Sequence, residues 1–479
     1  MMAARIRRCA LCALVAGLAA GCSSPLDPSR AEARAHAQAA PQDAPAPPPS
    51  AFRPDESATE QQPELGPSST PDDYIRYALF HSPSVESAYH RWLAAAERLP
   101  QVSALPDPRL SVGFFLDEVE TRVGAQQARI GVQQTFPWPG ELSGRKDAAA
   151  QAARAAWRQL EGARLVVTER VVSALHDLAY LDAAIGISRE NLDLLGSFEE
   201  VVRARYRVGA GSHPELIRVQ VELGQQEDRL AQLQAMRPSY IAQLNSVLNR
   251  RAETPVPELP RLPGRVVAAD REALVAQALE SNPTLLALDD RTDQERILAE
   301  VARTEGLPDL TVGLDYTFTD EAIDSSIPES GDDPILLSFG VTVPLWRDKY
   351  NAAVREALSR RLSISYERAS EANRIAAALH RAWFEHTDAD RRVRLYEQTL
   401  IPKAEESLQA SLAGFRTGET SFLDLLDTER TLLEFALAAE RARADRGKAL
   451  AVMHTLIGAE APTQPAGSPA PEHPSEETP

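Results

Sequence analysis

Cysteine is nearly absent from this sequence. The 479-residue chain has three cysteines, Cys9, Cys12 and Cys22, and all of them lie within its first 22 residues. A disulfide framework and a cysteine metal site are therefore excluded for the rest of the chain. Methionine is almost as scarce, with four residues, which is too few for a soft-metal relay. His380 and His386 fall on different faces of a predicted helix, so we expect no resident metal site.

Signatures of catalysis are also missing. No nucleophile elbow, phosphate-binding loop or dinucleotide fingerprint occurs, and we expect neither an enzyme nor a bound cofactor. Positively charged residues are fewer than negatively charged ones. The chain has 51 Lys and Arg residues and 69 Asp and Glu residues, which gives a formal net charge of −18. This excess of negative charge disfavours nucleic acid and anionic membrane surfaces as partners, and it is compatible with cationic cargo.

The N-terminus predicts export. In residues 1–21 a group of arginines precedes an apolar stretch that ends in small residues, which is typical of a signal peptide. The small residues before Cys22 are similar to a lipobox, in which the signal is removed and the cysteine is acylated, for instance with palmitate. Plain cleavage beside an incidental cysteine is the alternative. By the same resemblance, Ser23 favours sorting to the outer membrane.

Segments of low complexity flank the predicted fold. Residues 22–70 are rich in Ala and Pro and predict a disordered tether, and residues 460–479 predict a disordered tail, because such compositions bury no apolar core. Between them we expect a first repeat over 71–250, an irregular inter-repeat linker over 251–267 and a second repeat over 268–459.

The two repeats share short motifs. An aromatic-Arg-x-Gly run is followed three positions later by serine in each half. These residues are Tyr206, Arg207, Gly209 and Ser212 in the first copy, and Phe415, Arg416, Gly418 and Ser421 in the second, 209 residues later. Each motif predicts the turn of a helical hairpin, because glycine suits a left-handed helix end and Ser-x-x-Glu or Ser-x-x-Asp begins the next helix. Upstream, His81-Ser82-Pro83 recurs as Ser281-Asn282-Pro283.

Four segments alternate apolar residues with small or polar ones. They cover 110–116, 130–136, 310–318 and 337–343. Their length suits tilted strands that cross a bilayer, and a half-buried sheet on a soluble core is the alternative. We expect polar hairpin loops over 118–127 and 319–333, and no further strands.

Closure and anchoring follow from these strands. Four strands cannot close a barrel, and lipid tolerates no open edge, so three chains with twelve strands are expected. Trp138 and Trp346 each follow a strand end, where we expect them to anchor at the membrane interface.

Two segments with little proline predict very long helices. Residues 140–208 carry a heptad seam that includes Val167, Val171 and Leu178, and residues 350–415 repeat the pattern up to a break at Pro402. At about 1.5 Å per residue, roughly 70 residues reach about 100 Å, too long for a compact domain. Shorter helices are expected over 71–103 and 268–305.

The second hairpin turn, from Phe415 to Asp427, resembles that of the TolC family of trimeric outer-membrane efflux channels. The resemblance covers about residues 71–459, and the junction from Gln134 to Glu141 is similar to the one found in the heavy-metal efflux branch. It implies a mainly α chain with a small transmembrane β part. Four strands per chain would contribute to a twelve-stranded trimeric β-barrel, and the barrel would continue into a long coiled-coil helical tunnel. The chain would have an internal twofold repeat.

The resemblance also implies a function. A lipid-anchored homotrimer in the outer membrane would extend into the periplasm as a passive conduit. A periplasmic adaptor (membrane fusion) protein and an inner-membrane pump of the RND type would deliver its cargo, with heavy-metal cations the first candidate. Drug efflux and type I protein secretion are alternatives. A structural lipoprotein spacer without a pore is an alternative of another class, and the four strands argue against it.

Site residues follow from the resemblance as well. The adaptor is expected to dock on the hairpin tips, through Arg207, Gly209, Ser212, Arg416, Gly418 and Ser421. Asp424 and Asp427 match two aspartates that form the entrance constriction in the family. Asp424 would also be acidic as the capping partner of Ser421, which is a purely structural explanation for it.

Overall fold

The computed structural model describes residues 64–66, 68–323 and 328–465. These residues all belong to one compact unit, Pro47–Pro479. The predicted signal peptide, the predicted lipidation site Cys22, nearly all of the predicted tether and residues 466–479 lie outside the described part of the chain.

The two halves share one succession of elements, in which short helices are followed by two strands and then by a long helical hairpin. The first half comprises α3 (Pro71–His81), α4 (Pro83–Ala96), α5 (Arg98–Ser103), β1 (Arg109–Thr121), β2 (Gly124–Phe136), α6 (Glu141–Arg207) and α7 (His213–Val247). The second comprises β3 (Arg265–Val267), α8 (Arg271–Ser281), α9 (Pro283–Thr304), β4 (Asp309–Thr319), β5 (Ile335–Thr342), α10 (Arg347–Leu395), the π-helical η2 (Tyr396–Leu400), α11 (Ile401–Thr417), α12 (Phe422–Ile457) and β6 (Thr463–Pro465). The predicted internal repeat is confirmed.

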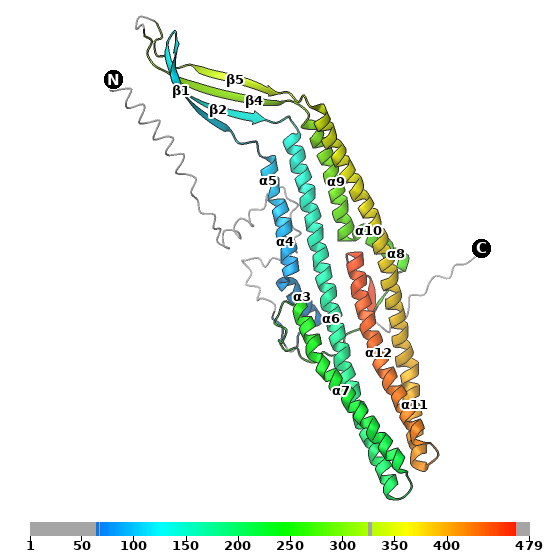
Figure 1. Cartoon of the computed structure of the whole chain (residues 1–479). Helices are drawn as coiled ribbons and strands as arrows, with labels where there is room; N and C mark the ends of the chain where they lie inside the picture. The colour runs from blue at the N-terminus through cyan, green and yellow to red at the C-terminus, as the bar shows by residue number, and fades with distance from the viewer. Residues whose placement is uncertain (1–63, 67, 324–327, 466–479) are drawn as a thin grey trace, which may run out of the picture. The chain divides into compact units, whose positions relative to one another are not determined.

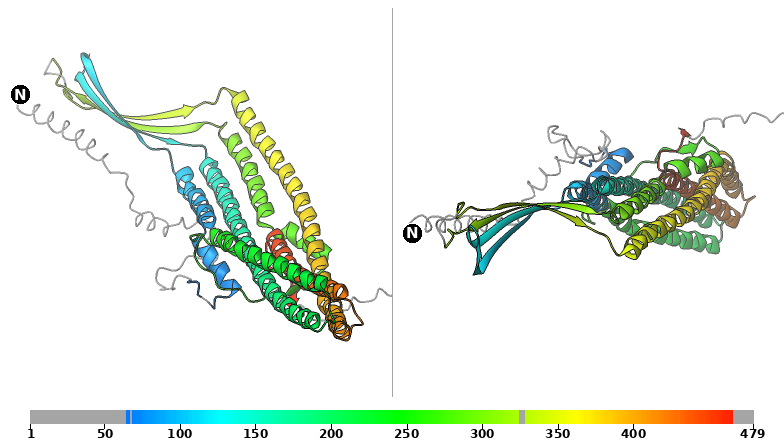
Figure 2. Two further views of the ribbon diagram at one scale, coloured as in Figure 1. Left: turned by 60° about the horizontal axis from the view of Figure 1, so that its bottom comes forward. Right: turned by 90° about the horizontal axis from the view of Figure 1, so that it is seen from above.

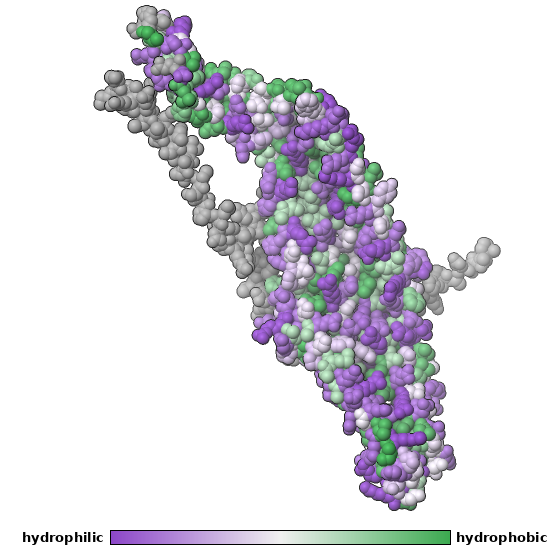
Figure 3. Space-filling model, viewed as in Figure 1, coloured by the Kyte–Doolittle hydropathy of each residue, from purple (hydrophilic) through white to green (hydrophobic). Residues whose placement is uncertain are grey.

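The four expected strands form one antiparallel sheet in the order β1-β2-β4-β5. Its register places one apolar residue of each strand in a single row, Leu110, Val132, Leu314 and Leu337. All four side chains are exposed, and Figure 3 shows hydrophobic residues over the strands. The sheet extends beyond the helices, and none of the described helices covers either face (Figures 1 and 2).

The first hairpin loop is shorter than expected. We expected a polar loop over 118–127, but β1 and β2 continue to Thr121 and Gly124 and leave a two-residue turn. Polar side chains do not prevent pairing here, because the backbone ladder continues through Glu120 and Ala125. The Thr121 hydroxyl donates to the carbonyl of Gly124 over 2.7 Å, and Gly124 has a φ of +136° that suits a tight turn.

A second correction concerns the expectation of no further strands. Residues 265–267 of the linker pair with residues 463–465 of the predicted tail as the two-stranded sheet β3-β6. Each strand is three residues long, too short to carry an alternating pattern. Backbone pairing therefore orders the start of the predicted tail, and it fastens the linker to the end of the second half.

The long helices agree with expectation. α6 has 67 residues, which corresponds to about 100 Å at 1.5 Å per residue. It packs along α7, α9 and α12, and the turns α6–α7 and α11–α12 lie at the end opposite the sheet (Figure 1). By length and composition alone α6 would pass as a membrane span, but 44% of its most apolar window is buried among its neighbours, as in the core helix of a bundle.

The other long helix is interrupted slightly earlier than Pro402. The π-helical turn Tyr396–Leu400 ends α10, and Pro402 occupies the first turn of α11. Proline has no backbone N–H and its ring displaces the preceding carbonyls, so the helix widens by one residue before it. The break at this position was predicted, and its π form was not.

The repeated short motifs dock the short helices onto the returning helices. The Asn249 amide donates to the carbonyl of His81 over 3.1 Å, and the Asn282 amide donates to that of Leu456 over 2.8 Å. Both returning helices end in a left-handed residue, Asn249 with a φ of 55° and Gly458 with a φ of 86°. In both halves the motif therefore lies against the end of the returning helix, although the donor is the returning helix in the first half and the motif in the second.

Gly458→Ala tests this contact. A Cβ at position 458 would lie 2.6 Å from the carbonyl oxygen of Ser281, and the left-handed backbone adds strain. We expect a loss of at least about 2 kcal/mol in the free energy of unfolding, measured by denaturation in detergent. Gly224→Ala is the control, because its Cβ meets nothing within 4 Å in α7, and it should gain about 0.5–1 kcal/mol. Equal effects would contradict the docking contact.

Candidate functional site

The strand-to-helix junctions place two tryptophans at the end of the apolar sheet. Trp138 lies between β2 and α6, and Trp346 lies between β5 and α10; both are exposed, Trp346 to 78%. The backbone N–H of Trp138 donates to the Asp309 carboxylate over 3.2 Å, which ties this junction to the start of β4. The position fits an interfacial anchor, and that role stays a prediction.

Both hairpin tips have the predicted turn geometry. Gly209 and Gly418 are left-handed, with φ of 73° and 88°. The Glu215 carboxylate accepts from the backbone N–H of Ser212 over 3.0 Å. At the second tip, Ser421 Oγ accepts from the N–H of Asp424 over 3.2 Å, and the Asp424 carboxylate accepts from the N–H of Ser421 over 3.3 Å. The two predicted capping boxes are confirmed.

One residue that the motif search missed joins the two tips. Arg205 donates to the carbonyl of Phe415 at the end of α11, and to that of Ala210 over 3.2 Å in its own tip. Its guanidinium also lies 4.5 Å from the centre of the Phe415 ring. Arg207 and Arg416, the predicted docking arginines, point to solvent instead. The repeat pattern singled out Arg207, whereas Arg205 has no arginine counterpart in the second half.

The two predicted constriction residues lie just beyond the second tip. Asp424 and Asp427 occupy the first turns of α12, and both are exposed in the single chain. The Ser421 hydroxyl donates a hydrogen bond to the Asp424 carboxylate, so Asp424 does cap this helix. The backbone carbonyl of Asp427 accepts from the Thr431 hydroxyl over 2.8 Å. Their side chains are therefore available to a pore, which is a necessary condition for the predicted role.

Two carboxylates, those of Glu222 and Glu429, are buried directly behind the tips. Arg430 of α12 donates from Nε to Glu222 of α7 over 3.2 Å, and the two hairpins are joined by this pair. Glu429 is 1% exposed. Burial, and to a smaller extent the nearby Glu222, raise the pKa of its carboxyl, whereas Asn191 and Arg430 lower it; the net pKa is about 7. The sequence signal for this layer was polar residues at seam positions, such as Gln226 in α7.

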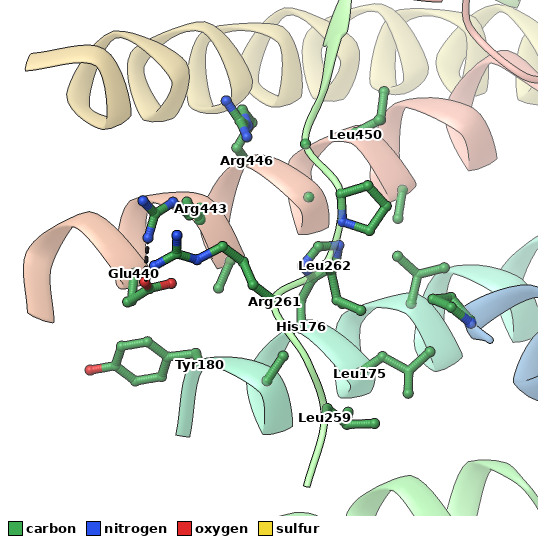
Figure 4. Close-up of a pocket in the computed structure, with 18 of the residues that line it drawn as sticks. Leu175, His176, Tyr180, Leu259, Arg261, Leu262, Glu440, Arg443, Arg446 and Leu450 are labelled. Atoms are coloured by element: carbon green, nitrogen blue, oxygen red, sulfur yellow. Dashed lines mark hydrogen bonds and ion pairs between the residues drawn. The ribbon is translucent and has the colours of Figure 1, made fainter. Parts of the chain in front are cut away.

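A separate cavity lies midway along the helices. It has a volume of about 920 Å³ between α6, α12 and the linker 258–265. Figure 4 shows Arg261 of the linker and Arg443 of α12 meeting at Glu440, and both arginines pair with that carboxylate. His176 lines the cavity, where burial and, next, Lys448 lower the pKa of its imidazole to about 4. Because these arginines pair within the protein, the cluster fastens the linker to the helices.

The described residues contain no group of three or more His, Cys, Asp or Glu side chains arranged to hold a metal ion. The structure instead has a sheet whose apolar residues are exposed, and long helices whose two hairpin tips contact each other through Arg205. Together these define an outer-membrane channel protomer of the kind that continues into a helical tunnel.

The comparisons with known proteins agree. The chain belongs to the outer membrane efflux protein family, whose model matches residues 74–250 and 274–459. It is 24% identical over 350 residues to the cobalt-zinc-cadmium resistance protein CzcC of Cupriavidus metallidurans, covering 70% of this chain and 77% of that protein. It is 25% identical over 320 residues to the outer membrane protein TolC of Vibrio cholerae, covering 65% of this chain and 72% of that one.

Solved structures show the same fold. The CusC transmembrane channel superposes with a TM-score of 0.68 at 14% identity, over 86% of this chain and 99% of that one. VceC, an outer membrane protein of Vibrio cholerae, superposes with a TM-score of 0.65 at 17% identity, over 81% and 96% of the two chains. These structures confirm the predicted TolC-family fold, and the family match identifies the protein as the outer-membrane channel component of an efflux system.

Proposed function

We propose that three copies of the chain close one pore, through which an inner-membrane pump exports its cargo. The observation that carries this proposal is the sheet. Its outer strands β1 and β5 have no neighbour on their open sides in the described chain, and both of its faces are uncovered. Unpaired backbone groups are not tolerated in lipid, and threefold assembly would join β5 of each protomer to β1 of the next.

The proposed partners are a periplasmic adaptor protein and a pump of the RND type. The adaptor would dock on the two tips, because they form the far end of the helices and expose Arg207 and Arg416. The pump would supply the energy, since nothing in the chain resembles an energy-converting motif. A spacer without a pore would have no use for a membrane-length apolar sheet.

We propose heavy-metal cations as the first cargo candidate. The likeness to CzcC supports this choice, and so do the net charge of −18 and the exposed pair Asp424 and Asp427. The likeness to TolC keeps drugs and secreted proteins as alternatives. The identity of the pump encoded alongside would distinguish them.

The pore proposal predicts both assembly and conductance. The detergent-solubilised protein should have the mass of a trimer and form cation-selective channels in planar bilayers. The double variant Asp424→Asn/Asp427→Asn removes both entrance carboxylates from each chain, and hence six negative charges from the narrow ring of the trimer. It should raise conductance and weaken block by divalent cations at least about tenfold. Glu215→Gln, the capping carboxylate of the other hairpin, is the control. A stable monomer, or unchanged block in the double variant, would contradict the proposal.

If the adaptor docks at the tips, a large side chain introduced there should block efflux, whereas backbone strain alone should not. Gly418→Trp should abolish efflux and crosslinking to the adaptor while the trimer persists. Gly418→Ala is the matched control, since it has the same positive φ and its Cβ meets only the end of Arg205 at 4.0 Å. It should retain efflux. Loss of function in both variants, or in neither, would argue against docking at this tip.

The lipid anchor is proposed from the sequence around Cys22 alone. Cys22→Ala should abolish the uptake of radiolabelled palmitate. The variant should still reach the outer membrane, because the strands provide membrane affinity of their own. A native protein that takes up no palmitate would show that the lipobox prediction is wrong.

A further inference from the structure

A polar layer interrupts the apolar packing behind the tips. On the tip side lies a cluster that includes Phe198, Phe415 and Phe422. On the other side lies a second cluster, with Ala184, Leu433 and Leu437. Between them, three helices bury polar or charged residues. These are Ser188 and Asn191 of α6, Glu222 and Gln226 of α7, and Glu429 of α12.

Several atoms of this layer have no hydrogen-bond partner in the described chain. They are Ser188 Oγ, Asn191 Nδ2, Gln226 Oε1 and both carboxylate oxygens of Glu429. The Asn191 amide acts as a hydrogen-bond donor that lowers the pKa of the Glu429 carboxyl, although no hydrogen bond of regular geometry joins the two side chains. Buried polar atoms normally find partners because an unmade hydrogen bond is costly. Their concentration in one layer therefore marks a site rather than a packing accident.

The charges of the layer do not balance. It contains two buried carboxylates, Glu222 and Glu429, and the one guanidinium beside them belongs to the exposed Arg430. Arg430 directs both Nε and Nη2 at Glu222, so no ion pair is left for Glu429 within the described residues. A buried carboxylate in that position needs either a positive charge or a proton.

We propose that Glu429 is a proton-binding site, and that its protonation state sets how tightly the two hairpins pack and hence how far the periplasmic entrance opens. The proposal rests on the channel function given above. With the proton bound, the carboxyl can donate a hydrogen bond within the layer, and its repulsion by Glu222 is removed. Without it, a bare charge lies between two apolar clusters, and parting of the hairpins lets water solvate it.

The direction of the pH effect follows from linkage. The pKa of the Glu429 carboxyl is about 7 in the packed state, against an ordinary value of 4.5, which it regains when water reaches it. Packing is therefore favoured at low pH. As the pH rises from 4.5 to 7, the ratio of packed to parted hairpins should fall by up to about tenfold per pH unit, and it should level off above pH 7.

Three helices surround Glu429 besides its own, and few of their groups carry charge. α7 contributes Glu222, and α12 contributes Arg430. Asp427, one turn away, acts on the pKa of Arg430. α6 contributes the neutral amide of Asn191, and α11 contributes apolar Leu408 to the neighbouring cluster. Within the described chain, the charged groups that shift the pKa of Glu429 are thus Glu222 and Arg430.

The competing explanation is that the layer only fixes the register of the helices, as a buried polar residue does in coiled coils. The two explanations differ in one respect. A register device works at any pH, whereas a proton site gives a pH dependence that disappears in Glu429→Gln. The amide keeps the size of the carboxyl and its neutrality at every pH.

Infrared difference spectroscopy tests the site independently of channel activity. The purified protein is titrated from pH 5 to pH 8, and the carbonyl stretch of protonated carboxyls is recorded. A band that disappears with a midpoint near pH 7 should be present in the wild type and absent in Glu429→Gln. Glu434→Gln, an exposed glutamate of the same helix, should leave the band unchanged. Absence of the band in the wild type would overturn the proposal, even if the protein conducts.

Conductance tests the consequence. Wild-type channels should conduct more as the pH rises from 5 to 7, and Glu429→Gln channels should stay at the low-pH level throughout. Glu222→Gln should move the midpoint to lower pH, because the like charge is gone and Arg430 is free to face Glu429. A pH dependence that persists in Glu429→Gln would assign it to Asp424 and Asp427 and overturn the proposal. If no variant conducts at any pH, the channel function fails, and the infrared band still decides the site.

Discussion

The two unpaired edges of the β1-β2-β4-β5 sheet are the constraint on which the rest of the architecture depends. Each unsatisfied backbone group in lipid costs several kcal/mol, so a protomer with this sheet is complete only beside its neighbours. The strands then fix where each helix begins. Asp309 holds the junction after β2, and Arg347 donates to the carbonyl of Gly306 over 2.9 Å at the start of α10. The helices leave the membrane side by side, already arranged as the wall of a tunnel.

Most of this architecture follows from local patterns, and the sequence therefore predicts it. Strand alternation and the heptad seam are short-range signals, and they predicted the existence of the four strands and the bounds of α6 to within a residue, whereas β1 and β2 extend five or six residues further toward their turn. The β3-β6 pair was missed because two three-residue strands carry no period of their own. Their pairing joins residues about 200 positions apart, and only the folded chain brings Val266 opposite Gln464. The short turn before Gly124 was missed for a related reason, since polar composition resembles a loop even where the backbone ladder continues.

The tip was predictable in its backbone but not in its side-chain contacts. Glycine and serine at fixed offsets specify a left-handed stop and a capping box, because these depend on neighbours within three residues. Arg205 and Phe415, or Glu222 and Arg430, are about 210 residues apart in sequence and meet only after the two hairpins pack. A seam position occupied by Gln226 or Glu429 signals a buried polar group, yet it does not say which carboxylate receives the arginine. That choice is made in three dimensions.

The residues that join the hairpins are also those in which the two repeats have diverged. At an offset of 209 residues, Arg205 corresponds to Gly414, Glu222 to Thr431, Glu429 to Gln220 and Arg430 to Val221. In a ring of identical helical hairpins, every contact between neighbouring hairpins would be the same. With two kinds of hairpin, the contact between them inside one chain can carry its own charged pairs, such as Arg430 with Glu222. Divergence of the repeats thus places charged partners at the contact between the two hairpins of one chain, which an undiverged repeat would lack.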